Sequence, residues 1–147
     1  TQGRSGRQNA IKEDNARREG SVAGTLLYIE DNPSNLKFVQ KVIETRRPGV
    51  ILLPAHAPQL GLDLATAHGP DFILLDIGLP DMDGFEVLAQ LAKNPSTARI
   101  PVVALSANAM PRDIERGLAA GFAEYLTKPI DVSRLLETLD RFIPRPS

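Results

Sequence analysis

Short apolar runs alternate with longer amphipathic stretches along most of this chain. Each run is bounded by turn or polar residues, and the runs lie at 25–29, 50–53, 72–75, 100–105 and 122–127. The run at 72–75 is wholly apolar, which predicts a strand buried on both faces. Between the runs, apolar residues recur at helical spacing and predict helices at 33–47, 59–68, 85–93, 110–120 and 132–142. Strands that alternate with helices favour an α/β fold, with a parallel sheet covered on both faces and right-handed crossovers.

Cap and turn residues mark the ends of the predicted helices. Asn32 is a suitable N-cap for the first helix, and Pro33 occupies the first helical position, where proline is tolerated. Asp131 is placed to cap the last helix. The apolar stripe of the first helix consists of Leu36, Val39 and Ile43, widened by Phe38 and Val42.

Residues 1–24 differ from the rest of the chain, because they are polar and hold almost no large apolar residue. Such a segment cannot build a core, so we interpret it as a linker or N-terminal extension with a short helix at 8–19. Its basic residues suggest an interaction arm as the alternative, but the interleaved acids favour a solvated linker. The folded domain is therefore expected to span 25–147.

Composition narrows the class of protein. The chain has 147 residues, 42% of them hydrophobic, which suits one domain with a full core. A formal net charge of −1 supplies no field that would attract nucleic acid or an anionic membrane. The chain has no cysteine and no apolar run near the roughly 20 residues that span a bilayer. We expect a cytoplasmic segment that contacts neither nucleic acid nor membrane, and its parent protein can still be membrane-anchored.

Polar residues stand where four of the five predicted strands end. They are Glu30 and Asp31 after the first strand, Asp76 after the third, Ser106 after the fourth and Lys128 after the fifth. Because the carboxyl ends of parallel strands meet at one edge of the sheet, where such folds place ligands, we expect these residues to form one site. An aspartate at the end of a buried strand is costly unless something compensates its charge.

The residue types in this group point to phosphoryl transfer. Three neighbouring carboxylates repel one another unless a cation joins them. Mg²⁺ suits this oxygen-only ligand set best, because it binds one or two carboxylates together with a phosphoryl oxygen; Mn²⁺ is an alternative. Lys128 can pair with a carboxylate or a phosphoryl group, and the Ser106 hydroxyl can donate to the same group. The pattern predicts Asp76 as the nucleophile, with Glu30 and Asp31 holding the metal.

Each of these residues has a simpler interpretation when taken alone. Glu30 and Asp31 precede a helix, where acids suit the helix dipole. Ser106 alone suits a turn, and Lys128 alone suits a surface position before a proline. Their combination at four separate strand ends favours the site.

The region from Thr25 to Ile143 resembles the receiver domain of two-component response regulators. The matching features are Glu30-Asp31, Asp76 with Pro80 four residues later, Ser106-Ala107 and Lys128-Pro129. The resemblance implies a flavodoxin-like doubly wound sheet with strand order 2-1-3-4-5 and five helices. The first acid is Glu30 where Asp is commoner, and Ser106 stands where Thr is also frequent. Neither departure puts phosphorylation in doubt.

The resemblance also implies a role for each site residue. Asp76 would accept a phosphoryl group from a phosphohistidine of a histidine kinase or histidine phosphotransfer protein. Asp31, Asp76 and the carbonyl of Gly78 would bind Mg²⁺, with Glu30 acting through water. Lys128, Ser106 and Ala107 would contact the phosphoryl group.

Signalling would depend on two of these positions. Ser106 and Tyr125 would act as the switch, and Tyr125 would turn inward on phosphorylation. Without the resemblance, Tyr125 would be an ordinary aromatic of an edge strand. The surface built from the helix at 110–120, the strand at 122–127 and the last helix would then change, and this is where receivers usually form homodimers or meet partner proteins.

Several other functions fit less well. An EF-hand at 81–84 requires an oxygen ligand where Leu79 stands and a glutamate where Gln90 stands. A flavin-binding module requires a phosphate-cradling loop after the first strand, where Glu30 and Asp31 would repel a phosphate. A metal-dependent phosphatase that acts on an external substrate requires a substrate pocket, and none can be recognised in this sequence. The alternative kept from another class is a pseudo-receiver, which retains the fold and acts as an unphosphorylated interaction module.

The domain is expected to carry its own phosphorylation and dephosphorylation chemistry, so whether it counts as an enzyme stays open. The polar leader without a starting Met favours a domain cut from a longer protein. A C-terminal receiver of a hybrid sensor histidine kinase is the preferred context, and a stand-alone regulator is the second.

Overall fold

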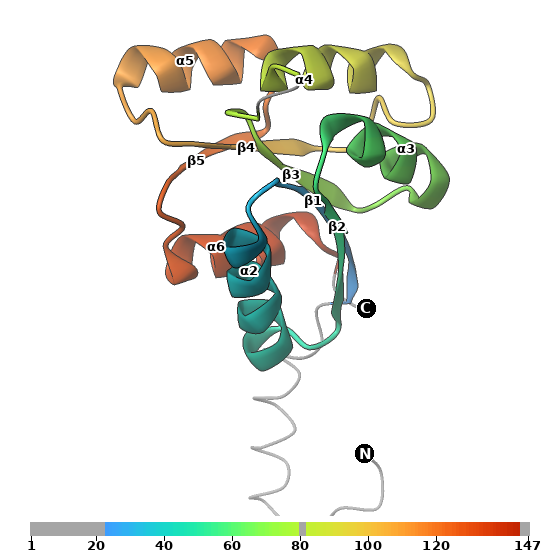
Figure 1. Cartoon of the computed structure of the whole chain (residues 1–147), viewed down its shortest axis with the longest axis vertical. Helices are drawn as coiled ribbons and strands as arrows, with labels where there is room; N and C mark the ends of the chain where they lie inside the picture. The colour runs from blue at the N-terminus through green and yellow to red at the C-terminus, as the bar shows by residue number, and fades with distance from the viewer. Residues whose placement is uncertain (1–22, 80–81, 145–147) are drawn as a thin grey trace, which may run out of the picture.

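The computed structural model describes residues 23–79 and 82–144 of the chain (Figure 1). The helix predicted at 8–19, and Pro80 in the resemblance, lie outside the described residues. Within them the chain forms an α/β domain, and no helix there is long and apolar enough to cross a membrane.

Five parallel strands form the sheet, in the order β2-β1-β3-β4-β5. Their bounds are β1 (Gly24–Ile29), β2 (Val50–Ala55), β3 (Phe72–Asp76), β4 (Val102–Ser106) and β5 (Glu124–Thr127). All residues of β3 and β4 are buried, as expected for central strands covered on both faces. The fold class and the strand order are therefore confirmed.

Five helices cover the sheet within the described residues: α2 (Pro33–Arg46), α3 (Pro58–His68), α4 (Gly84–Lys93), α5 (Pro111–Ala120) and α6 (Val132–Phe142). Figure 1 shows α2 and α6 on one face of the sheet and α3, α4 and α5 on the other. Each face has its own apolar cluster. The predicted caps are present, since the side chain of Asn32 accepts from the N–H of Ser34 and that of Asp131 accepts from the N–H of Arg134.

Strand ends differ from the predicted ones by up to two residues. β2 continues to Ala55 because Ala55 pairs with Ile29 of β1. β5 begins at Glu124 because Phe122, although buried, donates its N–H to the carbonyl of Gly117 at the end of α5. The apolar pattern records burial, and burial does not distinguish a paired strand from the turn that precedes it.

Phe38 does not belong to the buried stripe of α2, contrary to the prediction. Its side chain is 41% exposed, whereas Val39, Val42 and Ile43 are buried. Phe38 lies at the margin of the stripe, beside a groove that Lys128 and Ile130 also line. Helical spacing alone could not show where the core ends across the helix.

Candidate functional site

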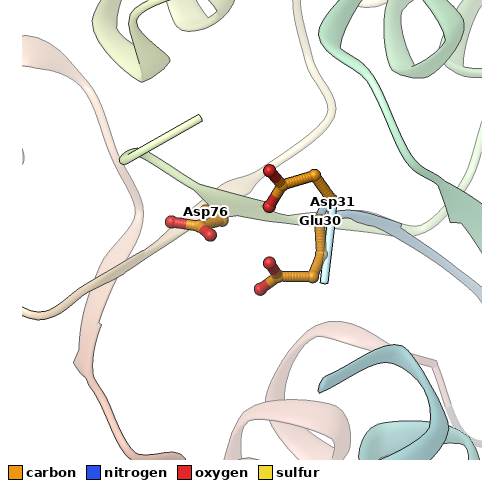
Figure 2. A group of neighbouring side chains, drawn as sticks. All are labelled: Glu30, Asp31 and Asp76. Carbon is orange, nitrogen blue, oxygen red and sulfur yellow. The ribbon is translucent and has the colours of Figure 1, made fainter. Parts of the chain in front are cut away.

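Sheet register brings the predicted acids together. Ile29 of β1 pairs with Leu75 of β3. Glu30 and Asp76 directly follow these two residues, so they are neighbours at the carboxyl edge of the sheet. Carboxylate oxygens of Glu30, Asp31 and Asp76 all lie within 4.8 Å of one another. Figure 2 shows the three carboxylates directed toward a common space. Glu30 and Asp76 are buried, and Asp31 is exposed.

Asp76 has a donor on each carboxylate oxygen. The Nζ of Lys128 donates to Oδ2 at 2.8 Å, and the backbone N–H of Gly78 donates to Oδ1 at 2.9 Å. Lys128 follows β5, and its own N–H donates to the carbonyl of Ser106, which continues the ladder past the strand end. These contacts compensate the charge that the buried strand end would otherwise leave unpaired.

Glu30 is the most deeply buried of the three acids, with 1% of its surface exposed. The hydroxyl of Tyr28 donates to its Oε1 at 3.0 Å, and the N–H of Asn32 donates to its Oε2 at 3.1 Å. Burial raises the pKa of Glu30 above its ordinary value, and the negative charge of Asp76 raises it further. A cation at this site would relieve both effects.

Tyr28 was missed as a site residue by the sequence reasoning. Its signal was a phenol in an otherwise apolar buried strand, two residues before Glu30 and therefore on the same side of the strand. A buried phenol usually hydrogen bonds to a partner. Burial, followed by the charge of Glu30, raises the pKa of Tyr28, so its hydroxyl keeps its proton and remains a donor.

Ser106 and Tyr125 contact the same residue from two sides. The Oγ of Ser106 accepts from the N–H of Asn108 at 3.0 Å, and the hydroxyl of Tyr125 donates to the Asn108 carbonyl at 3.0 Å. Tyr125 is 8% exposed, so its ring already lies inward in the unmodified chain. This is the orientation that the resemblance assigns to the phosphorylated domain. Asn108 is a link that the sequence reasoning did not identify.

A cavity of about 420 Å³ lies at the site. Most of the predicted site residues line it, namely Asp76, Gly78, Ser106, Ala107, Tyr125 and Lys128. Glu30 and Asp31 lie beside it through their contact with Asp76. A small anionic group placed in this cavity would meet the ammonium of Lys128 and the hydroxyl of Ser106.

The acidic group fits a hard divalent ion on the chemistry of its donors. All three side chains offer carboxylate oxygens, which are the ligands that Mg²⁺ and Mn²⁺ accept. Gly78 contacts Asp76 through its N–H, so the carbonyl role implied for it stays a prediction.

Comparisons with known proteins agree with this geometry. The family model of the response regulator receiver domain matches residues 26–140. The polar-differentiation response regulator DivK of Brucella ovis is 37% identical over 119 residues, which cover 81% of this chain and 95% of that protein.

Solved structures show the same fold. The receiver domain of sensor histidine kinase PA1611 from Pseudomonas aeruginosa, with a magnesium ion coordinated in its active site cleft, has a TM-score of 0.72 at 29% identity, covering 82% of this chain and 97% of that one. Vibrio cholerae chemotaxis protein CheY4 has a TM-score of 0.74 at 25% identity, covering 82% of this chain and 99% of that one.

Proposed function

This chain belongs to the response regulator receiver domain family of two-component signalling, and we propose that Asp76 is its phosphoacceptor. The observation that carries the proposal is the position of Asp76. It is buried between two further carboxylates and the ammonium of Lys128, which lies 2.8 Å from its Oδ2. The donor would be a phosphohistidine on a histidine kinase or a histidine phosphotransfer protein.

The transfer needs a carboxylate nucleophile and a way to neutralise the incoming group. An oxygen of Asp76 forms a bond to phosphorus while the bond from phosphorus to the imidazole nitrogen breaks, and that nitrogen keeps the electron pair. Lys128 can move from the carboxylate to a phosphoryl oxygen, and the Ser106 hydroxyl can donate to another. Gly78 and Ala107 line the same cavity.

Glu30, Asp31, Asp76 and the carbonyl of Gly78 would hold Mg²⁺, or Mn²⁺ in its place. The bound ion would supply positive charge against the phosphoryl oxygens. Glu30 would act through water in this arrangement, as the resemblance implies, and its two oxygens also accept from Tyr28 and Asn32. The close approach of three carboxylates supports this assignment.

The signal would leave the site through Asn108. Its N–H donates to Ser106 and its carbonyl accepts from Tyr125, so a movement of the Ser106 hydroxyl toward a phosphoryl group would break its contact with the residue that also holds Tyr125. We place the output surface on α5, β5 and α6, where a homodimer or a partner protein would bind. The same chain would thus couple phosphorylation at the sheet edge to a protein contact.

The proposal is tested by intact-mass spectrometry after incubation with acetyl phosphate, with Mg²⁺ and with EDTA. We expect one phosphoryl adduct that requires Mg²⁺ and disappears in Asp76→Asn. Asp63→Asn, which removes an exposed carboxylate of α3, is the matched control and should keep the adduct.

Absence of an adduct from the wild-type chain under every condition would contradict the proposal. It would favour the pseudo-receiver, which works through constitutive contacts. An adduct that persists in Asp76→Asn would place the acceptor on another residue.

A further inference from the structure

Tyr28 is the only polar residue among the buried positions of β1. Its neighbours Leu26, Leu27 and Ile29 are aliphatic, and all four side chains have no exposed surface. The ring packs in the apolar cluster beneath α2 and α6, where a phenylalanine ring would also fit. Packing therefore accounts for the ring but leaves the hydroxyl unexplained.

The hydroxyl is directed to the acidic site. Residues two apart on a strand share a face, and this spacing lets Tyr28 reach the Oε1 of Glu30 at 3.0 Å. The N–H of Asn32 occupies Oε2 at 3.1 Å. One donor on each oxygen restricts the rotation of the carboxylate, which a glutamate side chain would otherwise permit.

The same oxygen of Glu30, Oε1, also has a competing partner. The Nζ of Lys128 lies 4.0 Å from the Oε1 of Glu30 and 2.8 Å from the Oδ2 of Asp76. Without the hydrogen bond from Tyr28, nothing would hold that oxygen in place, and the attraction of Lys128 would draw Glu30 closer to it. Glu30 would then turn away from Asp31 and compete with Asp76 for the lysine.

We propose that Tyr28 is a positioning residue that orients Glu30 for the divalent cation and keeps Lys128 on Asp76. The proposal rests on the proposed function, because it assumes that the three acids hold the ion. Residues that orient metal ligands through hydrogen bonds commonly change metal affinity by 10-fold to 100-fold when they are removed. A residue that only fills the core would leave the affinity unchanged when its hydroxyl is deleted.

Isothermal titration calorimetry with Mg²⁺ on the folded chain separates these two roles. Tyr28→Phe keeps the ring and removes the hydroxyl, and we expect its dissociation constant for Mg²⁺ to rise about tenfold. Thr97→Val is the matched control, because it also removes a buried hydroxyl, one that donates to the carbonyl of Leu91. Unchanged Mg²⁺ affinity in Tyr28→Phe, or an equal loss in Thr97→Val, would overturn the proposal.

A double-mutant cycle tests whether Tyr28 acts through Glu30. In a Glu30→Ala background the Phe substitution should change Mg²⁺ affinity no further, because the carboxylate it orients is gone. A loss of the same size in both backgrounds would overturn the proposal. Should Tyr28→Phe fail to fold, as judged by circular dichroism, Tyr28→Leu is the second variant without the hydroxyl, and it should show the same loss.

Phosphorylation by acetyl phosphate supplies an independent readout. A positioning role predicts that Tyr28→Phe needs more Mg²⁺ for the half-maximal rate, while the rate at saturating Mg²⁺ stays unchanged. A lower rate at saturation with unchanged Mg²⁺ affinity would overturn the proposal.

The two proposals fail in different ways. Absence of an adduct on the wild-type chain would refute phosphorylation of Asp76. The calorimetry would still decide the role of Tyr28, because it measures metal binding without any transfer.

Discussion

Two helices of nearly equal length, α5 and α6, flank β5 on opposite faces of the sheet (Figure 1), and they are held very differently. α6 buries Leu135, Leu136, Thr138 and Leu139. Among its ten residues, α5 buries only Gly117, and its Leu118 is 47% exposed. The apolar area removed from water, and with it the stabilisation, is therefore much larger for α6.

Specific side-chain contacts strengthen the same contrast. Arg47, at the end of α2, donates to both carboxylate oxygens of Asp140 in α6 at 2.8 Å, and Phe142 packs against Phe72 of β3. α5 contacts the rest of the domain through the partly buried side chain of Ile114, through Gly117, which lies against Tyr125, and through Arg116, which lies over Phe85.

This difference distinguishes a firmly packed helix, α6, from a helix that can move more easily, α5. α6 packs on the sheet through four buried residues, whereas α5 is attached through one buried glycine, the partly buried Ile114 and an exposed cation–π contact. A helix with little buried surface can shift at low cost. This is the helix that follows Ser106 and packs on Tyr125, which agrees with its proposed place in the output surface.

The largest expected difference in stability between the two helices comes from a pair of leucine truncations. Leu139→Ala in α6 should lower the free energy of unfolding by about 2–5 kcal/mol, because it removes a fully buried side chain and leaves a cavity. Leu118→Ala in α5 should change it by less than about 0.5 kcal/mol. Urea unfolding followed by circular dichroism measures both, and equal losses would refute the contrast.

A smaller loss of stability is expected when the ion pair between Arg47 and Asp140 is broken. Asp140→Asn removes the charge opposite Arg47, whose side chain is 10% exposed, and should lower the free energy of unfolding by about 1–3 kcal/mol. Glu137→Gln, on the same helix and 74% exposed, is the matched control and should have almost no effect. If both substitutions cost the same in urea unfolding, the pair does not anchor α6.

The smallest effect on stability, with the sharpest effect on structure, is expected at Gly117. A Cβ there would lie 2.7 Å from the Cδ2 of Tyr125, so Gly117→Ala should push the ring outward and break its bond to the Asn108 carbonyl. The better helix propensity of alanine, worth about 1 kcal/mol, offsets part of that loss. We expect a small change in unfolding free energy and a large shift of the Tyr125 ring resonances in NMR spectra.

Ala119→Gly is the control for this substitution, because Ala119 is an exposed residue of the same helix. It should cost about 1 kcal/mol through helix propensity alone and leave the Tyr125 resonances in place. An unmoved Tyr125 ring in Gly117→Ala would show that α5 yields more readily than the ring. That result would sharpen the view of α5 as the movable part.

The amino-acid sequence by itself determined the fold class and most of the acidic site. The apolar run ending in Asp76 predicted a strand buried on both faces, and the acids, serine and lysine after four strands predicted a cluster at one edge. The buried strand and the clustering are confirmed, because burial and strand ends leave a local pattern, whereas the chemistry of the cluster stays a prediction. The strand order came from the family resemblance, because the pattern does not specify which strands pair.

Only the tertiary structure decided the contacts between segments distant in sequence. It placed Lys128 on Asp76, Asp140 on Arg47 and the Tyr125 hydroxyl on Asn108. It also showed that Phe38 lies outside the core and that the Tyr28 hydroxyl donates to Glu30. Such contacts depend on strand register and on how helices lie across the sheet, and these are set by packing of the whole domain, which leaves no periodic signal in any one segment.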